Sequence, residues 1–449
     1  MADFTKEQTL AITTLDRNVS VSAGAGSGKT RVLVERFLTI LKDPDKSANR
    51  ILAITFTNKA AGELKERLKA MLGDTMGGDV FASTFHSACV RILRRDAERI
   101  GFPKSFTIYD SDDQQRVIKQ IYKELMIDDK FLPVKSAISQ ISGYKDKLLS
   151  AKDVAAEAPR DTKAALISKI YTAYSNRLRT AGAMDFDDLI FHTVQMLKTD
   201  AEAREYYQQK FRYVVVDEYQ DTNALQDAIY FALAAPDASN LFFVGDIKQS
   251  IYRFRQADPS VFVGKQTAWQ PYPADAPVPY PEPATIALDA NFRSAPEVVR
   301  GINFLFEQLM TPELGDTAYG DGQRLVCGAP GEYQGSVEVQ FLPDDETETD
   351  AGWIAERIAQ LVSAGEPVRE GSTTRPVQYE DCCILLSARG DFPAYVEALT
   401  ARGIPVYADA RENLMEAPHI RPLISLLKVI DNPAQDIYLA AAMLGPLFG

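Results

Sequence analysis

A short run of small residues between two apolar segments constrains this 449-residue chain more than any other feature. The run is Ala23-Gly-Ala-Gly-Ser-Gly-Lys29-Thr30; Val19–Val21 before it predicts a strand, and the apolar spacing from Val32 to Leu41 after it predicts an amphipathic helix. Small residues let backbone N–H groups close around a phosphate, and the positive end of the following helix points at the same place. The order strand, glycine-rich loop, helix therefore predicts a phosphate-binding loop, in which Ala23 stands where the usual pattern has glycine.

The neighbouring segments alternate between strand and helix patterns. A second strand is expected at Ile51–Ile54 and a second helix at Ala60–Leu72, and apolar runs return at Tyr213–Val216 and Leu241–Val244. This βαβα order is typical of a parallel sheet with helices on its faces, which places the chain in the α/β class.

The apolar run Val214–Val216 ends in two carboxylates, Asp217 and Glu218. In a phosphate-binding enzyme, Asp217 can hold a magnesium ion together with Thr30, and Glu218 can orient and deprotonate the attacking water. Lys29 would then neutralise the β and γ phosphates. An Asp-Glu pair at this place can also be a solvated strand end, but the phosphate-binding loop favours the catalytic interpretation. The residues expected around the nucleotide phosphates are Ala23, Gly24, Ala25, Gly26, Ser27, Gly28, Lys29 and Thr30.

Further segments resemble the sequence boxes of UvrD/Rep-type superfamily 1 helicases. Asp217-Glu-Tyr-Gln-Asp-Thr-Asn223 resembles the family's DExQDTN box, and the other matching segments in chain order are Thr55–Ala61, Ser83–Ser87, Gly245–Arg255 and Asn291–Ser294. The resemblance covers essentially the whole chain. It implies an ATP- and Mg²⁺-dependent motor built on RecA-like domains, which translocates 3′ to 5′ along single-stranded DNA or DNA with a 3′ tail.

The resemblance also implies roles for individual residues. Gln8 lies where the family's adenine-reading glutamine lies, and Phe292 would stack on the adenine. Gln249 would sense the γ-phosphate and Arg293 would bind it, although a surface ion pair is the alternative for Arg293. The residues expected to line the DNA path are Phe56, Thr57, Asn58, His86, Tyr252 and Phe254. The alternative for the aromatic residues is a place in the hydrophobic core, because aromatic side chains serve both for stacking on bases and for core packing.

A finer resemblance points to the AddA subunit of bacterial helicase–nuclease complexes. UvrD usually has two acids before the Gln-Ser of its third box, whereas this chain has Ile247-Lys248, and Gln249–Phe262 is similar to AddA. Ser83–Asp113 is more similar to UvrD or PcrA. We favour the AddA-like interpretation, which implies an AddB-type partner subunit, and a stand-alone UvrD- or PcrA-like repair helicase is the alternative.

The resemblance predicts a domain plan. The expected parts are a first RecA-like domain at 1–86 and 184–295, a helical insertion at 87–183, a partial second RecA-like domain at 296–420, and the start of a second helical insertion at 421–449. Strands of the second RecA-like domain are expected at Val337–Leu342, Cys383–Leu386 and Ile404–Tyr407. The proline-rich segment 271–283 is expected to be an exposed loop.

Two sequence elements of the family do not appear in this chain. They are a Gly-Leu-Glu element and an arginine finger in a Thr-Arg-Ala context, both of which belong to the later part of the second RecA-like domain. We therefore expect a chain that stops before the motor is complete, with slow hydrolysis and weak or absent unwinding. The alternative is a module that binds nucleotide and single-stranded DNA without useful turnover.

Composition sets looser bounds. Cys89, Cys327, Cys382 and Cys383 form no CxxC pair, so a zinc site or disulfide framework is not expected. No signal peptide and no long apolar run is visible, which predicts a cytoplasmic protein without a membrane segment. The net charge of −13 argues neither for nor against nucleic acid, because residues 1–150 are net basic and the remainder is acidic.

Overall fold

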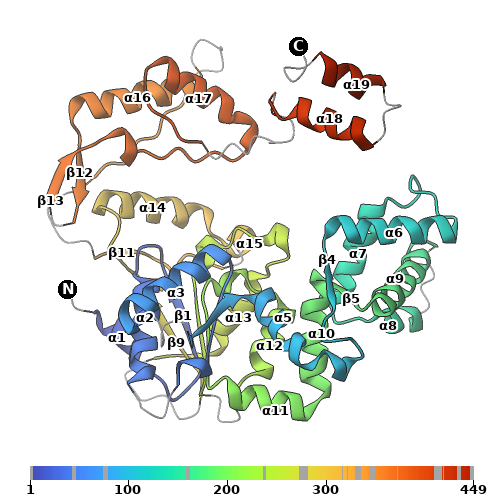
Figure 1. The fold of residues 1–449 in the computed structure, drawn as a ribbon. Helices are drawn as coiled ribbons and strands as arrows, with labels where there is room; N and C mark the ends of the chain where they lie inside the picture. Colours follow the sequence, from blue (N-terminus) through green and yellow to red (C-terminus); the bar gives the residue numbers. More distant parts are fainter. Residues whose placement is uncertain are drawn as a thin grey trace. The chain divides into compact units, whose positions relative to one another are not determined.

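The computed structural model describes residues 4–444, apart from 43–46, 74–78, 158–161, 236–238, 273–281, 316, 321, 329–334, 343–348, 372, 409–416, 418 and 432–435. The chain divides into two compact units (Figure 1). The first comprises Met1–Pro330 and Gln334–Ser336, and the second comprises Gly331–Tyr333 and Val337–Gly449. The division therefore lies about 35 residues beyond the predicted domain boundary at 295/296, and most of the predicted loop 271–283 lies outside the described residues.

The first unit is built on a parallel sheet of seven strands, in the order β3-β2-β6-β7-β1-β9-β8. The four strands expected from the sequence are present, and they are β1 (Val19–Ala23), β2 (Ile51–Thr55), β6 (Tyr213–Val216) and β7 (Leu241–Gly245). Three further strands complete the sheet: β3 (Phe81–Thr84), β8 (Gln270–Pro271) and β9 (Ala284–Leu288). The prediction of an α/β fold with a RecA-like parallel sheet is confirmed.

Helices cover both faces of this sheet (Figure 1). Alternate residues of each central strand enter different cores: Val215 packs in one core, and Val214 and Val216 pack in the other. Helices α1 (Lys6–Thr13), α2 (Lys29–Leu41) and α3 (Asn58–Leu72) cover the Val215 face. The opposite face is covered by α5 (Phe85–Asp96), α10 (Phe186–Thr199), α11 (Ala201–Lys210), α12 (Ala224–Ala232) and α13 (Pro259–Ala268). Burial on both faces explains why the central strands are continuous apolar runs.

The predicted helical insertion has a core of its own, formed by buried residues between Ile118 and Ala183. Its elements are β4 (Thr107–Tyr109), α6 (Ser111–Leu125), α7 (Val134–Asp146), α8 (Ala151–Ala156), α9 (Thr162–Ala181) and β5 (Ala183–Asp185), with β4 and β5 paired in parallel. The structure differs from the prediction at the start of this segment. Helix α5 lies within the predicted insertion 87–183 for most of its length, yet it packs in the core of the large sheet.

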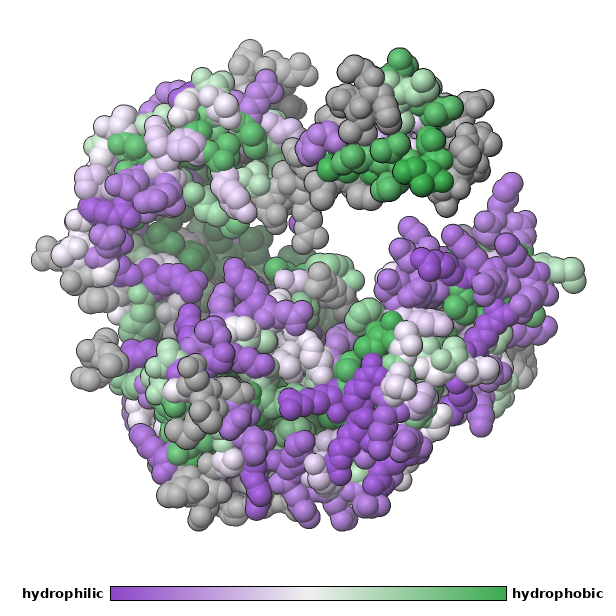
Figure 2. Space-filling model, in the orientation of Figure 1, coloured by the Kyte–Doolittle hydropathy of each residue, from purple (hydrophilic) through white to green (hydrophobic). Residues whose placement is uncertain are grey.

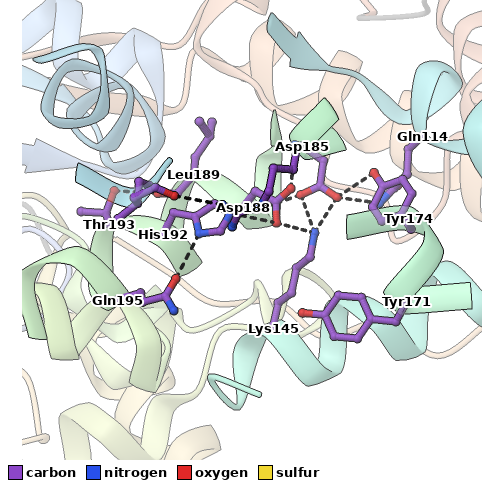
Figure 3. A network of polar contacts seen from close by, with 12 residues as sticks. Gln114, Lys145, Tyr171, Tyr174, Asp185, Asp188, Leu189, His192, Thr193 and Gln195 are labelled. Carbon is purple, nitrogen blue, oxygen red and sulfur yellow. Dashed lines mark hydrogen bonds and ion pairs between the residues drawn. The ribbon is translucent and has the colours of Figure 1, made fainter. Parts of the chain in front are cut away.

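A buried network of polar side chains joins the insertion to α10 (Figure 3). Lys145 of α7 is 1% exposed, and its Nζ donates to Asp185 Oδ1 and Oδ2 at 2.9 and 2.7 Å and lies 2.8 Å from Asp188 Oδ1. Tyr174 and Gln114 donate to Asp185 at 2.9 and 3.2 Å. Burial would lower the pKa of Lys145, but the two carboxylates outweigh it and raise that pKa, so the ammonium stays charged.

We expect Lys145→Met to destabilise the first unit strongly. The substitution leaves two buried carboxylates, Asp185 and Asp188, without their cation, and breaking a buried ion pair from one side costs ~3–5 kcal/mol. Urea unfolding followed by circular dichroism measures the loss as a lower midpoint. Lys147→Met, at an exposed position two residues away, is the matched control. Equal midpoints for the two variants would show that the network adds little to stability.

Residues 296–327 extend the first unit beyond the sheet. Helix α14 (Pro296–Leu309) and the short helix α15 (Pro312–Gly315) lead to β11 (Val326–Cys327), which pairs in parallel with β10 (Ala290–Asn291). Asn303 of α14 fixes the backbone of Leu325, the residue before β11. Its Oδ1 accepts the N–H of Leu325 at 3.0 Å, and its Nδ2 donates to Leu325 O at 2.9 Å. This connection places Leu325 beside the phosphate-binding loop, where a Cβ at Gly24 would lie 2.4 Å from Leu325 Cδ2.

The second unit contains helices and one hairpin in its described residues. They are α16 (Asp350–Ala364), the antiparallel pair β12 (Pro367–Glu370) and β13 (Thr373–Pro376), α17 (Phe392–Ala401), α18 (Arg421–Asp431) and α19 (Asp436–Met443). The three strands expected at Val337–Leu342, Cys383–Leu386 and Ile404–Tyr407 are not formed, so that prediction is wrong. A strand needs a hydrogen-bonding neighbour as well as an apolar pattern. Here several of the apolar side chains remain exposed, with Leu385 at 90% and Tyr407 at 94%, whereas Ile404 packs in a small core with Leu399.

Apolar side chains are also exposed on the two C-terminal helices. Helices α18 and α19 carry an apolar patch (Figure 2), which includes Leu427 and Ile430 of α18 and Met443 of α19. Within the described part of the chain, no helix combines the length and the apolar character that a membrane crossing requires.

Candidate nucleotide and nucleic-acid site

The phosphate-binding loop lies between the end of β1 and the start of α2, as expected. Gly26 and Gly28 have φ values of 71° and 82°, and Gly28 is the N-cap of α2 without a side-chain cap. Ser27 is 1% exposed, and its Oγ has no hydrogen-bond partner among the described residues. Uncapped N–H groups at a helix start and a buried orphaned hydroxyl are features that fit an anionic ligand.

The segment after β9 supports the loop from one side. The N–H of Phe292 donates to Gly26 O at 2.9 Å, and Asn291 Nδ2 donates to Ala25 O at 2.8 Å. A Cβ at Gly26 would lie 2.9 Å from both Arg293 Cβ and Asn291 Oδ1, so only glycine fits there. Sequence reasoning had given Asn291 no role, yet it holds Arg293 beside the loop by accepting that residue's N–H at 2.9 Å.

Gln8 supports the loop from α1. Its Nε2 donates to Ser27 O at 2.8 Å, and its Oε1 accepts the N–H of Thr5 at 3.0 Å in a capping box. The side chain is 4% exposed. The structure therefore brings Gln8 to the predicted site, where its carboxamide touches the loop; adenine recognition stays a prediction. Phe292 is half-buried and packs close to Gly328, where a Cβ would come within 2.7 Å of its ring.

Two carboxylates follow β6 at the same edge of the sheet. Burial and the neighbouring Glu218 raise the pKa of Asp217 to about 6, and the positive charge of Lys29 opposes this shift. Glu218 has the left-handed backbone conformation (φ 55°, ψ 40°), which is uncommon for a residue with a side chain and costs ~1–3 kcal/mol. Its buried Oε2 has no hydrogen-bond partner among the described residues. A strained residue that presents an unpaired carboxylate oxygen fits a general base.

A cavity of about 180 Å³ opens beside these carboxylates. Asp221, which sequence reasoning had not singled out, is among its lining residues; burial and Glu218 raise the pKa of its carboxyl to about 7. The cavity is also lined by Phe56 and His86, and burial lowers the pKa of His86. The acidic site and two of the residues predicted to contact DNA therefore share one cavity.

The turn after β7 carries Gln249. Its N–H donates to Asp246 O at 2.9 Å, and its side-chain Nε2 donates to Asp246 Oδ2 at 2.6 Å. Asp246 is 1% exposed, and its own N–H donates to Gln220 Oε1 at 3.0 Å. Gln220, in the Asp217–Asn223 box, thus links the two turns that follow β6 and β7.

Three aromatic residues form a row, which we define as Phe56, Tyr252 and Phe254. Phe56 follows β2, and the other two follow the turn after β7. The ring centroids of Phe56 and Tyr252 are 4.4 Å apart, and those of Tyr252 and Phe254 are 5.8 Å apart. Phe254 is 76% exposed and the other two are half-buried, so a place in the core is wrong for Phe254. Thr57 caps α3 by accepting the N–H of Ala60 at 3.1 Å, and Asn58 after it is exposed.

His86 forms a second aromatic contact with a residue that sequence reasoning missed. Its ring meets that of Phe186 edge to face at 5.8 Å, and Phe186 is 50% exposed. Phe186 is the first residue of α10, directly after the N-cap Asp185. An exposed phenylalanine at a helix start was the available signal, but the sequence alone does not show that it lies beside His86.

The residues present fit a magnesium ion held by Asp217 and Thr30. The charge of Lys29, the first residue of α2, acts on the carboxyl group of Asp217, and Thr30 follows Lys29 in the chain. Carboxylate and hydroxyl oxygens are the ligands that Mg²⁺ prefers, usually with substrate phosphates completing the shell. Among the described residues there is no cluster of three or more His, Cys, Asp or Glu side chains that could hold a metal ion.

Comparisons with known proteins identify the family of this chain. A family model described as UvrD/REP helicase N-terminal domain matches residues 4–270. The chain belongs to the UvrD/Rep helicase family. The ATP-dependent DNA helicase PcrA of Staphylococcus epidermidis is 34% identical over 437 residues, which cover 97% of this chain and 55% of that protein. PcrA of Staphylococcus aureus is 35% identical over 433 residues, which cover 96% of this chain and 54% of that protein.

The chain thus spans about half the length of the curated relatives it matches. These relatives do not support the predicted closeness to AddA or an AddB-type partner subunit, and a PcrA-like repair helicase fits them. They also give no support to the expectation of an incomplete motor. The roles of the individual residues within the UvrD/Rep family site stay predictions.

Proposed function

We propose that this chain carries the ATP-hydrolysing motor of a DNA helicase of the UvrD/PcrA kind, which moves 3′ to 5′ along single-stranded DNA. One observation carries the proposal. The phosphate-binding loop, the orphaned carboxylate of Glu218 and the aromatic row all lie at the carboxyl edge of the same sheet, after β1, β6, β2 and β7. Ligands of open α/β sheets bind at this edge.

The chain's own residues would act on ATP as follows. Lys29 and the N–H groups of the loop balance the phosphate charge, and Glu218 accepts a proton from the attacking water. Gln249 and Arg293 contact the γ-phosphate, where charge spreads over the oxygens in the transition state. Mg²⁺, when bound by Thr30 and Asp217, neutralises further charge on the β and γ phosphates.

The aromatic row supplies the DNA contact. Stacking on bases is independent of sequence, because every base presents a π-face, and each stacked base contributes ~1–3 kcal/mol. The turn Asp246–Gln249 lies between the nucleotide site and Tyr252, so a change around Gln249 has only two residues to cross before it reaches the row. The same turn contacts the Asp217–Asn223 box through Gln220. This short path supports a coupling of hydrolysis to movement along DNA.

The proposal predicts that single-stranded DNA stimulates ATP hydrolysis by this chain, and that the aromatic row mediates the effect. Replacing Tyr252 and Phe254 together by alanine should weaken binding of a fluorescent oligothymidylate about tenfold or more, since stacking on at least one base is lost. The melting temperature should change little, because Phe254 is largely exposed. The stimulated rate should fall at a fixed DNA concentration and the rate without DNA should remain.

A control and two contrary outcomes define this test. Phe131→Ala removes another exposed phenylalanine, outside the row, and should leave DNA affinity unchanged. Unchanged DNA affinity in the double variant would remove the row from the DNA path. Nucleotide binding without any DNA-stimulated hydrolysis in the wild-type chain would favour a binding module over a motor.

A further inference from the structure

Lys248 stands where the resemblance to UvrD predicts an acid, and its side chain is buried. The ammonium is 5% exposed as a side chain and lies 2.9 Å from Asp246 Oδ1. It also donates to Gln323 Oε1 at 3.1 Å. A buried cation on a surface turn needs partners for its N–H groups. Lys248 has one partner two positions away, Asp246, and one 75 positions away, Gln323.

Asp246 connects this ammonium to Gln249. Oδ1 of Asp246 accepts from Lys248 Nζ and from the Lys248 N–H at 3.1 Å, and Oδ2 accepts Gln249 Nε2 at 2.6 Å. An ionised carboxylate only accepts hydrogen bonds, so it selects the NH₂ end of the Gln249 carboxamide. Oε1 and the second N–H of Gln249 then remain for other partners. The rest of Gln249 is exposed, so this contact is what orients its side chain.

Gln323 is the second hydrogen-bond partner of the Lys248 ammonium. It belongs to the segment that leads to Leu325, which is 4% exposed and packs on the phosphate-binding loop, because a Cβ at Gly24 would lie 2.4 Å from Leu325 Cδ2. Leu325 is held by Asn303 through two hydrogen bonds. Lys248 therefore spans from the Gln249 turn to a segment in contact with the loop itself.

We propose that Lys248 is a positioning residue for the nucleotide γ-phosphate: its buried ammonium fixes Asp246, and Asp246 fixes the carboxamide of Gln249. This inference rests on the proposed ATP site and adds a residue to it. An apolar side chain at position 248 leaves Asp246 with a buried, unbalanced charge, and the turn must rearrange to hydrate it. Gln249 then loses its fixed orientation, while the phosphate-binding loop keeps its own N–H groups and Lys29.

The test compares affinities for ADP and for a non-hydrolysable ATP analogue, measured by calorimetry with Mg²⁺. Only the triphosphate reaches Gln249, so the ratio of the two affinities reports on its position without any turnover. Lys248→Met should lower the preference for the triphosphate about tenfold, the effect of one hydrogen bond to a charged group, with ADP affinity unchanged. Lys248→Arg keeps the charge and should retain most of the preference.

Two further variants separate positioning from stability. Lys265→Met breaks another 2.9 Å ion pair, to Asp227, whose side chains are somewhat more exposed, at 11% and 20%. This variant should lower the melting temperature without changing the preference. In a Gln249→Ala background, Lys248→Met should cause no further loss, since residues that act through one another are not additive. Gln323→Leu loosens the ammonium without removing it and should lower the preference by a smaller factor, which decides the matter if Lys248→Met does not fold.

The outcomes separate this inference from the proposed function. A wild-type chain that binds neither nucleotide would overturn both. A wild-type chain that prefers the triphosphate, together with a Lys248→Met variant of equal preference, would overturn the positioning role alone. Equal losses for ADP and the triphosphate, or additive losses with Gln249→Ala, would also overturn it, because Lys248 would then support the site in general.

Discussion

Replacing Lys29 by alanine is expected to abolish tight nucleotide binding by this chain. Lys29 is the first residue of α2, and it lies close enough to Asp217 and Asp221 to oppose the rise of their pKa values. A hydrogen bond to a charged group contributes ~1.5–3 kcal/mol, so ATP affinity should fall by about ten- to a hundredfold. Hydrolysis should fall further, by on the order of 10²–10³ in rate, because Lys29 also stabilises the charge that shifts onto the phosphate oxygens in the transition state.

Calorimetric titration with ATP and Mg²⁺ measures the affinity, and phosphate release measures the rate. Lys42→Ala is the matched control, since Lys42 is exposed at the other end of the same helix and far from the loop. Both variants should keep the wild-type melting temperature. If Lys29→Ala bound ATP with unchanged affinity, the assignment of the loop 23–30 to phosphate would be wrong.

The central part of the fold was predictable because its signals are local. A parallel strand buried on both faces is a continuous apolar run, and Tyr213–Val216 and Leu241–Gly245 follow that pattern. The strand Phe81–Thr84 was missed as a strand because it ends in Ser-Thr, although these last two residues belong to the segment Ser83–Ser87 that carried the family resemblance. In the second unit, the alternation of Val337, Val339 and Phe341 fits a strand, but pairing depends on a neighbouring strand that local sequence does not specify.

The site was predictable as a set of residues and unpredictable as a network. The loop, the carboxylates and the aromatic row come from motifs of fixed spacing. Contacts between distant residues have no such spacing: Lys145 and Asp185 are 40 positions apart, and Lys248 and Gln323 are 75 apart. Likewise nothing in a sequence shows that Glu218 takes a left-handed backbone conformation, since that conformation is set by the elements on either side.

Glu218→Gln is expected to separate binding from hydrolysis. Glutamine keeps the size of the side chain and removes its ability to take a proton, and loss of a general base costs ~10²–10⁴ in rate. ATP affinity should be equal to or greater than that of the wild type. Glu218 is one of the groups that raise the pKa values of Asp217 and Asp221, so its neutralisation lowers both. Asp217 is then more fully ionised near neutral pH and better able to bind a cation.

Single-turnover hydrolysis and calorimetric titration, run on the same preparation near pH 7, distinguish the possible roles of Glu218. Glu205→Gln removes one exposed negative charge from α11 and should leave both quantities unchanged. If the Glu218→Gln variant lost binding and hydrolysis in proportion, the carboxylate would be holding the nucleotide site together, and the general-base role would be wrong. The strained backbone of Glu218 and its unpaired Oε2 argue for the general-base role, because a residue needed only for structure would gain nothing from either feature.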